Sequence, residues 1–190
     1  MSPTSPAPDP EHVFRSLYAV AYPDLLRFVQ RRAHPDHAPD VVAEAFLVVW
    51  RRLDELPCQE DDARAWVFGI TRNLLLNEQR GARRRQALGV RLSNITSASH
   101  AGADDNADAA ISRVDLGRAW KLLSEVHQEA LGLAVFERLT APQAAAVLGI
   151  SPVAFRLRLS RARRALRLHL DHPPQSSATP ARTSERTGTS

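Results

Sequence analysis

The sequence predicts an all-α protein of two small helical domains joined by a flexible linker. Three observations support this fold class. Apolar residues recur at helical spacing over most of the chain, Pro and Gly stand where helices begin and end, and a polar stretch without an apolar period divides the chain. The length of 190 residues suits two small domains, and a hydrophobic content of 44% is typical of a globular protein.

Composition divides the chain into five segments. Residues 1–10 hold four prolines and residues 171–190 are rich in Pro, Ser, Thr and Arg, so both ends are expected to be disordered. Residues 11–91 and 113–170 are the two expected helical domains. The stretch 92–112, rich in Ser, Ala, Asn and Asp, is the expected linker.

The first domain should begin with a helix over 11–33 that is kinked or broken at Pro23, followed by a helix over 40–53. One face of the second helix is an apolar stripe, formed by Val42, Phe46, Val49 and Leu53. The other face leans acidic, yet it contains a leucine with a valine beside it, which favours a protein partner over plain solvent. Its residues are Asp40, Glu44, Leu47, Val48 and Arg51.

A third helix is expected over 63–80, after a polar loop at 56–62. Four apolar residues can pack inward: Trp66, Val67, Ile70 and Leu74. Outer faces are left with Arg64, Phe68, Arg72, Asn73 and Gln79, and the helix runs into Arg80, Arg83, Arg84 and Arg85. A basic surface with an aromatic residue can hold a single nucleic-acid strand by charge and stacking, although Phe68 and Trp66 alone would more often be core residues.

In the second domain, helices over 111–123 and 125–139 should supply a core, the second capped by Ser124. The expected core residues are Leu116, Trp120, Leu123, Leu131, Val135 and Phe136.

Residues 139–168 predict a helix-turn-helix. Thr140 and Gln143 have the spacing of a capping box, Gly149 can end the first helix, and Ser151-Pro152 can begin the second. The second helix of such a motif lies in the DNA major groove. Here it carries an apolar stripe (Phe155, Leu159, Ala162 and Leu166) together with six arginines and no acid in residues 154–170. Solvated helix faces usually mix charge signs, so this face predicts DNA contact.

The net charge of +4 hides two basic blocks. Residues 63–91 carry 7 basic and 1 acidic side chains and residues 113–170 carry 10 and 4, whereas residues 1–62 carry 6 and 11. Two separated basic blocks suggest two contacts with one polyanion.

Cys58 is the single cysteine, which excludes an intrachain disulfide, and neither a signal peptide nor an apolar run of membrane-spanning length is present. A soluble protein of the cytoplasm is therefore expected.

Three segments of the chain match the motifs of one protein family, in that family's order. Residues 38–50, APDVVAEAFLVVW, resemble AEDLVQExFLxVW, and residues 64–74, RAWVFGITRNL, resemble RAWLxxIARNx. The segment LTAPQAAAVLGIS and the helix after it resemble LSxxEIAxxLGISxxTVxxRLxRAR. Through these motifs the chain from Phe14 to Leu170 resembles bacterial RNA polymerase sigma factors of the extracytoplasmic-function (ECF) type.

The resemblance implies a protein that binds RNA polymerase core, directs promoter-specific initiation and carries no catalytic residue, metal or cofactor. The helix from Asp40 would dock on the clamp helices of the beta-prime subunit. The minus-ten element would be recognised and melted by Arg64, Phe68, Arg72, Asn73, Arg80, Arg83 and Arg84. A flipped base would enter a pocket built by the Leu56–Asp62 loop and the helix carrying Asn73, which offsets an unstacking cost of a few kcal/mol.

The resemblance also places the minus-thirty-five element on the second helix of the helix-turn-helix. The expected contacts are Pro152, Val153, Ala154, Arg156, Leu157, Arg158 and Arg161. Several of these side chains offer few hydrogen bonds to base edges, so they would recognise thymine methyls or DNA shape. Further expected partners are the polymerase beta flap and, left open, an anti-sigma factor. The free protein should be a monomer that binds no membrane.

The chain departs from the family pattern at three places. Ala43 stands where the docking helix usually has glutamine, Gly69 stands where a larger residue is common, and Ala154-Phe155 replace threonine-valine.

Two other classes of function stay open at this stage. A helix-turn-helix regulator acting without polymerase would use its first half for dimerisation or sensing. It would dimerise and bind an operator unaided, which size-exclusion chromatography can test. An enzyme with His34, His37 and Cys58 as metal ligands is disfavoured, because the two histidines bracket a proline and no other cysteine, phosphate-binding glycine loop or nucleophile motif is present.

Overall fold

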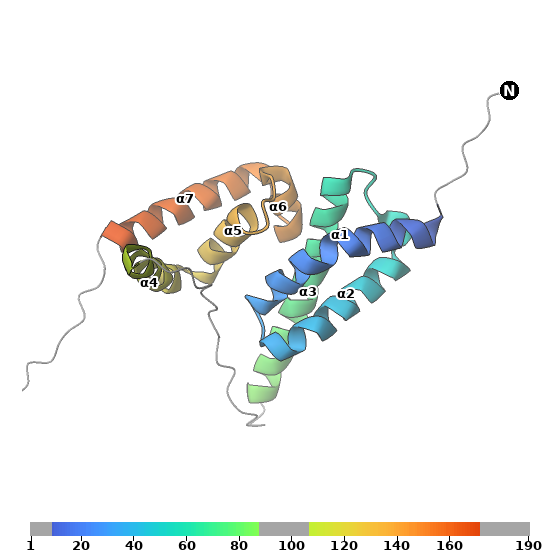
Figure 1. Cartoon of the computed structure of the whole chain (residues 1–190), viewed down its shortest axis with the longest axis horizontal. Coiled ribbons are helices and arrows are strands. Elements are labelled where there is room, and N and C mark those ends of the chain that lie inside the picture. Colours follow the sequence, from blue (N-terminus) through green and yellow to red (C-terminus); the bar gives the residue numbers. More distant parts are fainter. Residues whose placement is uncertain (1–8, 88–106, 172–190) are drawn as a thin grey trace, which may run out of the picture.

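The computed structural model describes residues 9–87 and 107–171, and in these residues every regular element is a helix. The N-terminal unit consists of α1 (Pro10–Gln30), α2 (Ala38–Arg51) and α3 (Glu60–Ala87), with short 3-10 turns at Pro35–His37 and Leu53–Glu55. The C-terminal unit consists of α4 (Ala107–Leu122), α5 (Glu125–Val135), α6 (Ala141–Leu148) and α7 (Pro152–Asp171) (Figure 1). The all-α prediction with two helical units is confirmed.

The boundaries of the expected segments differ from those in the structure. The expected linker falls largely outside the described residues, but its last part, 107–112, belongs to α4 rather than to a linker. The expected lead-in ends earlier, because the Asp9 carboxylate accepts a hydrogen bond from the backbone N–H of Glu11 and Pro10 begins α1. The expected tail lies outside the described residues from position 172 on.

In the N-terminal unit, α1 continues through Pro23 without a break, contrary to expectation. The proline is exposed, and the fully buried Ala21 and Leu25 on either side hold the helix together. Tertiary packing therefore outweighs the local cost of about 3 kcal/mol of an interior proline. On α2, the predicted apolar stripe is buried except at its end, Leu53, which is half-buried in the following turn.

The third helix is longer than expected, because it begins at Glu60 inside the predicted loop and continues through the arginine cluster. The assignment of Phe68 to an outer face is wrong, and the alternative that it is a core residue is confirmed. Its ring is fully buried and packs edge-to-face on Phe28, with the ring centroids 5.1 Å apart. The expectation of a buried Trp66 is met only in part, since its ring is half-buried and lies 5.6 Å from the Arg52 guanidinium.

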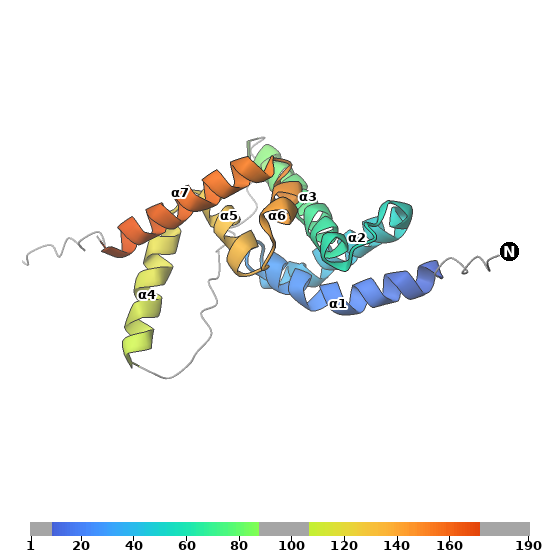
Figure 2. The same cartoon turned by 90° about the horizontal axis from the view of Figure 1, so that it is seen from above.

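In the C-terminal unit, Ser124 caps α5 as expected, since its hydroxyl accepts the backbone N–H of His127 at 3.4 Å. The small core of this unit is formed by Leu123, Leu131 and Ala162, with Trp120 packed against it. Three predicted core residues, Leu116, Val135 and Phe136, lie largely at the surface. The helix α5 ends at Val135 instead of 139, so Val135 and Phe136 lie at its end rather than on its apolar face. Leu116 belongs to α4, which projects away from α7 (Figure 2).

The predicted helix-turn-helix is confirmed, including the residues that begin and end its helices. Thr140 and Gln143 form the capping box, and Gly149 ends α6 in the left-handed conformation, with φ of 66°. The Ser151 hydroxyl accepts the N–H of Ala154 at 3.2 Å and starts α7. Phe155 and Ala162 of the predicted stripe are fully buried.

The two units also pack against each other. Helix α3 lies beside α6 in both views (Figures 1 and 2), and one hydrophobic cluster contains buried residues of α1 to α3 as well as of α5 to α7. Gly69 contributes to this contact, because a Cβ added there would lie 3.9 Å from the Cα of Val147. The expectation of separate domains did not include this shared core.

We predict that Phe155→Ala lowers the free energy of unfolding by about 3–5 kcal/mol, because it leaves a cavity in the fully buried position of the ring. Urea denaturation followed by circular dichroism measures this loss. Val153→Ala is the matched control on the same helix, and as a surface change it should stay within about 0.5 kcal/mol of the parent. Equal values for the two variants would contradict the placement of Phe155 in the core.

Candidate nucleic-acid and partner interfaces

The first turns of α7 present the predicted minus-thirty-five residues to solvent. Val153 is 68% exposed and Leu157 is 52% exposed, which are high values for apolar side chains at the start of a well-capped helix. Arg158 is half-buried beside the apolar stripe. The other predicted residues are exposed: Pro152, Ala154, Arg156 and Arg161. The structure thus brings this predicted set together on one element.

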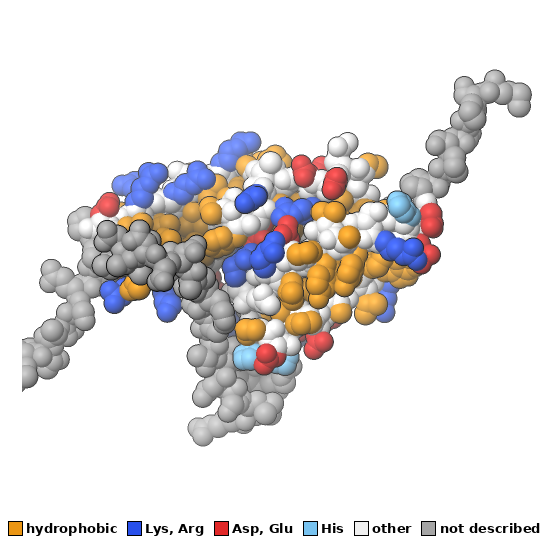
Figure 3. Space-filling model, viewed as in Figure 1, with side chains coloured by type: hydrophobic (Ala, Val, Ile, Leu, Met, Phe, Trp, Pro, Cys, Tyr) orange, Lys and Arg blue, Asp and Glu red, His pale blue; other side chains and the backbone are white. Residues whose placement is uncertain are grey.

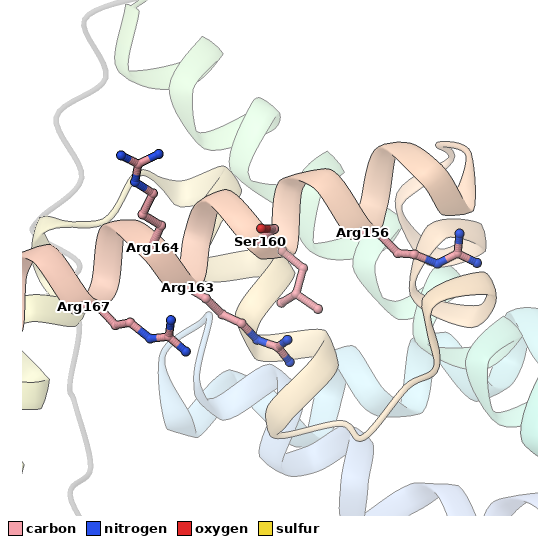
Figure 4. A pocket seen from close by; sticks show the side chains of 6 residues that line it. Arg156, Ser160, Arg163, Arg164 and Arg167 are labelled. Atoms are coloured by element: carbon pink, nitrogen blue, oxygen red, sulfur yellow. The ribbon is translucent and has the colours of Figure 1, made fainter.

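Three arginines on α7 were not among the predicted site residues: Arg163, Arg164 and Arg167. Together with the predicted Arg156 and with Leu159 and Ser160, they line an open hollow of about 500 Å³, and Arg156, Ser160, Arg163 and Arg167 stand at i, i+4, i+7 and i+11. Figure 4 shows Arg163 and Arg167 on the same side of the helix and Arg164 on the other side. This spacing was visible in the sequence as the polar counterpart of the apolar stripe. The positive surface therefore extends along α7 beyond the predicted contacts.

The acid-leaning face of α2 is exposed as predicted. Leu47 is 57% exposed between the exposed side chains of Asp40, Glu44 and Arg51, and Val48 is half-buried. Figure 3 shows apolar side chains gathered on the face formed by α1 and α2. Tyr18 and Trp50 belong to the exposed apolar residues of these helices, and the structure adds them to the predicted set.

Aromatic packing holds these two additional residues in place. Tyr18 packs on Phe46 with 4.5 Å between the ring centroids, and Trp50 packs edge-to-face on Phe14 at 5.1 Å. Rings that are rigidly held and half-exposed are typical of protein interfaces. Sequence periodicity assigned neither residue to this surface, because both lie at the border between the apolar and polar faces of their helices.

The predicted minus-ten residues of α3 fall into two groups. Asn73, Arg80, Arg83 and Arg84 are exposed. Arg64 is turned toward Asp24 on α1 and the Glu137 carbonyl in the turn after α5, Arg72 is turned toward Glu129 on α5, and Phe68 is buried. The structure therefore leaves only the second half of the predicted surface open to a ligand.

A buried carboxylate stands at the junction of the two units. Glu137, in the turn between α5 and α6, is 1% exposed. Its Oε1 accepts a hydrogen bond from Arg31 Nη2 at 2.5 Å and lies 3.8 Å from Arg32 Nη1. Arg64 Nη1 donates to the backbone carbonyl of Glu137 at 2.9 Å, while Arg64 Nη2 donates to Asp24 Oδ2 at 2.6 Å. Three arginines of the N-terminal unit thus converge on one residue of the C-terminal unit.

Burial governs the ionisation of this cluster. It raises the pKa of the Glu137 carboxyl above its ordinary value, although the charges of the surrounding arginines oppose that shift. Burial also lowers the pKa of Arg32 to about 10, which leaves this guanidinium protonated at neutral pH. At Asp24 partial burial raises the pKa, but Arg64 and Arg27 outweigh it, so the pKa lies below its ordinary value.

Two further polar contacts extend the junction along α3. Arg72 donates from Nε and Nη2 to the two carboxylate oxygens of Glu129 on α5, at 2.6 and 3.1 Å, and this is a bidentate fork. Gln143 Nε2 at the start of α6 donates to Asp62 Oδ1 at 3.1 Å. Within the described residues, no buried side-chain nitrogen or oxygen lacks a hydrogen-bond partner.

Among the helices that the structure describes, none is long and apolar enough to cross a membrane.

Two family models match the chain. Residues 17–85 match sigma-70 region 2, and residues 113–166 match sigma-70, region 4. These ranges contain the exposed face of α2, all of the predicted α3 residues and the helix-turn-helix.

Curated relatives and solved structures agree with these matches. The ECF RNA polymerase sigma factor SigL of Mycobacterium tuberculosis is 30% identical over 159 residues, which cover 83% of this chain and 89% of the relative. RNA polymerase sigma factor CnrH of Cupriavidus metallidurans is 31% identical over 140 residues, covering 70% and 72%.

The fold is similar to that of sigma factor RpoE from Bartonella quintana, solved with the anti-sigma factor NepR, with a TM-score of 0.65, 25% identity and coverage of 85% of this chain and 98% of that one. It is also similar to CnrH solved with the cytosolic domain of CnrY, with a TM-score of 0.56, 24% identity and coverage of 85% and 89%. The chain therefore belongs to the extracytoplasmic-function RNA polymerase sigma factors, a family that directs promoter-specific transcription initiation and is not a class of enzymes.

Proposed function

We propose that this sigma factor divides its work among three surfaces. The exposed face of α2 docks on the beta-prime clamp helices of polymerase, α3 and the loop before it capture the opened minus-ten strand, and α7 holds the minus-thirty-five duplex. The C-terminal unit also reaches the beta flap. The proposed place of action is the cytoplasm, with the free protein a monomer.

The observation that carries this proposal is the presence, on one chain, of an exposed acid-leaning stripe around Leu47 and of an arginine-rich helix-turn-helix. A regulator acting on duplex DNA alone would need the second feature only. Acidic groups around an exposed leucine fit a basic protein partner better than they fit DNA, because phosphates repel carboxylates.

An anti-sigma protein is proposed as an additional partner. Two solved structures similar to this chain contain a sigma factor bound to an anti-sigma factor or to the cytosolic domain of a partner named CnrY. The apolar side chains exposed on α1 and α2 offer a surface for such a protein.

The proposal is tested by mapping the 5′ ends of transcripts made on genomic DNA by polymerase core with and without this protein. New start sites that share two upstream elements about two helical turns apart would support it, since about 10 base pairs separate adjacent turns. Operator binding by a dimer without core, and no new start sites, would favour the regulator instead.

Charge reversal on α2 should weaken polymerase binding. In Asp40→Lys/Glu44→Lys two exposed carboxylates beside Leu47 become repulsive toward a basic partner, and we expect affinity for core to fall by about ten-fold or more, with a stronger effect at low salt. Fluorescence anisotropy with labelled core measures the change. The control Asp54→Lys/Glu78→Lys has the same net charge change at exposed positions outside the stripe. If both doubles bind core as the parent does while remaining folded, α2 is not the docking surface.

Asn73 should act in strand opening rather than in initial binding. It is exposed on α3 next to Arg72, so Asn73→Ala removes a polar contact to the strand without disturbing the core. We expect open-complex formation to fall on duplex promoter and to recover on a template with a pre-opened bubble. Permanganate footprinting on the two templates measures the difference. Equal losses on both would point to a docking or folding defect.

Arg158 and Arg161 should differ in the kind of DNA contact that they make. We propose that Arg158, nearer the N-terminus of α7, contacts a base, and that Arg161 contacts phosphate. Arg158→Ala should then lose about 1–3 kcal/mol of discrimination between matched and mismatched elements, whereas Arg161→Ala should weaken all sequences alike and lower the salt slope by about one. Binding titrations over a salt series measure both quantities, with Arg15→Ala on α1 as the control for lost charge. Unchanged specificity in Arg158→Ala would contradict the assignment.

A further inference from the structure

The outward surface of α7 is divided lengthwise by an apolar line. Val153 and Leu157 stand at i and i+4 and are 68% and 52% exposed, and they face away from the buried Phe155 and Ala162 of the apolar stripe. Their side chains can contact thymine methyls but donate no hydrogen bond to DNA. Most of the affinity of α7 for a duplex must therefore come from the residues beside this line.

An arginine row, Arg156, Arg163 and Arg167, runs along one side of the apolar line. The three side chains are exposed, and at 100° per residue they lie within about 40° of one another around the helix axis. Figure 4 shows Arg163 and Arg167 on the same side of α7 and Arg164 on the other side. From Arg156 to Arg167 the row is about 16 Å long, at about 1.5 Å of rise per residue.

Arg161 lies on the opposite side of the apolar line. The arginine row stands about 80° from the line in one direction around the helix, and Arg161 stands about 60° from it in the other. An α-helix with its side chains is about 10–12 Å across, and the major groove is about 12 Å wide. A helix that inserts its apolar line into the groove therefore presents the arginine row to one wall and Arg161 to the other. These two walls are the phosphate backbones of the two strands.

The charges of the arginine row are not compensated within the part of the protein that the structure describes. Arg27 and Arg64 of the N-terminal unit pair with carboxylates, whereas none of the ion pairs within residues 9–87 and 107–171 includes an arginine of α7. Arg163 and Arg167 stand at i and i+4, where like charges repel each other and destabilise a helix. A polyanion relieves this repulsion, and guanidinium groups bind phosphate through two parallel hydrogen bonds.

We propose that the arginine row binds the phosphate backbone of one promoter strand, while Arg161 binds the backbone of the other strand. This inference rests on the proposed binding of α7 to the minus-thirty-five duplex, and it adds Arg163 and Arg167 to the contacts. Because phosphates carry no sequence information, these two residues supply affinity and hold the helix in register. The choice of sequence stays with the apolar line and Arg158.

Strand-specific neutralisation of the DNA tests the proposal. The probe is the upstream duplex recovered by transcript mapping, in three forms. One form is unmodified, and each of the other two carries methylphosphonates in place of the phosphates of one strand, over the element and its flanks. The full-length protein is titrated onto each form over a salt series, and Arg163→Ala/Arg167→Ala is compared with Arg161→Ala and with the parent.

We expect Arg163→Ala/Arg167→Ala to bind the unmodified duplex about ten-fold or more weakly, and to lower the salt slope by about two, because each lost phosphate contact lowers it by about one. The loss should be equal on matched and mismatched elements. It should disappear when one strand is neutralised, whereas the loss in Arg161→Ala should disappear only when the other strand is neutralised. Such a crossed pattern shows that the two changes act on different partners.

Two controls separate phosphate binding from a general loss of charge. Arg163→Lys/Arg167→Lys keeps both charges and should keep the salt slope of the parent. Arg15→Ala/Arg118→Ala removes two charges outside α7, from side chains that are 72% and 70% exposed, and should leave the slope unchanged. All these variants change exposed side chains, so their melting temperatures should stay near that of the parent.

Three results would overturn the inference. They are an unchanged salt slope in Arg163→Ala/Arg167→Ala, a loss in that variant confined to matched elements, and recovery of both this variant and Arg161→Ala on the same neutralised strand. The parent protein reports separately on the proposed function. If it produces no new start sites with polymerase core, the proposed function is wrong and the inference falls with it, whereas a parent that starts transcription without the crossed pattern contradicts the inference alone.

Discussion

The arrangement of the two units depends on one buried carboxylate that is surrounded by arginines of the opposite unit. Glu137 is excluded from water, yet Arg31 and Arg32 neutralise its side chain and Arg64 binds its backbone carbonyl. Removing one partner of such a cluster would leave a buried charge without compensation, which costs far more than the intact cluster contributes. The cluster therefore determines where the C-terminal unit sits more than how stable it is.

Arginines of this protein bind carboxylates within the chain as well as facing solvent. Basic side chains that recognise a polyanion are attracted to any carboxylate within reach, so a protein with two basic surfaces and an acidic stripe has internal alternatives to DNA. In this sigma factor Arg72 has such an alternative in Glu129, whereas Arg163 and Arg167 on α7 line an open hollow. The face of α3 that carries Arg72 is thus covered by a carboxylate of the C-terminal unit, whereas the arginines along α7 are exposed.

Two departures from the family pattern, Gly69 and Phe155, can be related to packing in the structure. Gly69 stands where a larger residue is common, and a Cβ added there would lie 3.9 Å from the Cα of Val147 on α6, which is an ordinary van der Waals contact. Phe155 stands where the family usually has valine, and its ring is fully buried in the hydrophobic cluster that the two units share. Both departures therefore lie where the units pack against each other.

The positions of the helices and of their ends were largely determined by the local sequence alone. Capping residues, the left-handed glycine at 149, the helical spacing of apolar residues and the exposed stripe around Leu47 depend on neighbours along the chain, so both helical units and much of the candidate site could be predicted. Three features were decided only by the tertiary structure: the choice of Phe28 as the packing partner of Phe68, the exposure of Val135 and Phe136, and the hydrogen bonds of Arg64 and Arg72 to the other unit. Each of them depends on contacts between residues far apart in the chain, and helical periodicity shows which side chains share a face but not what that face meets.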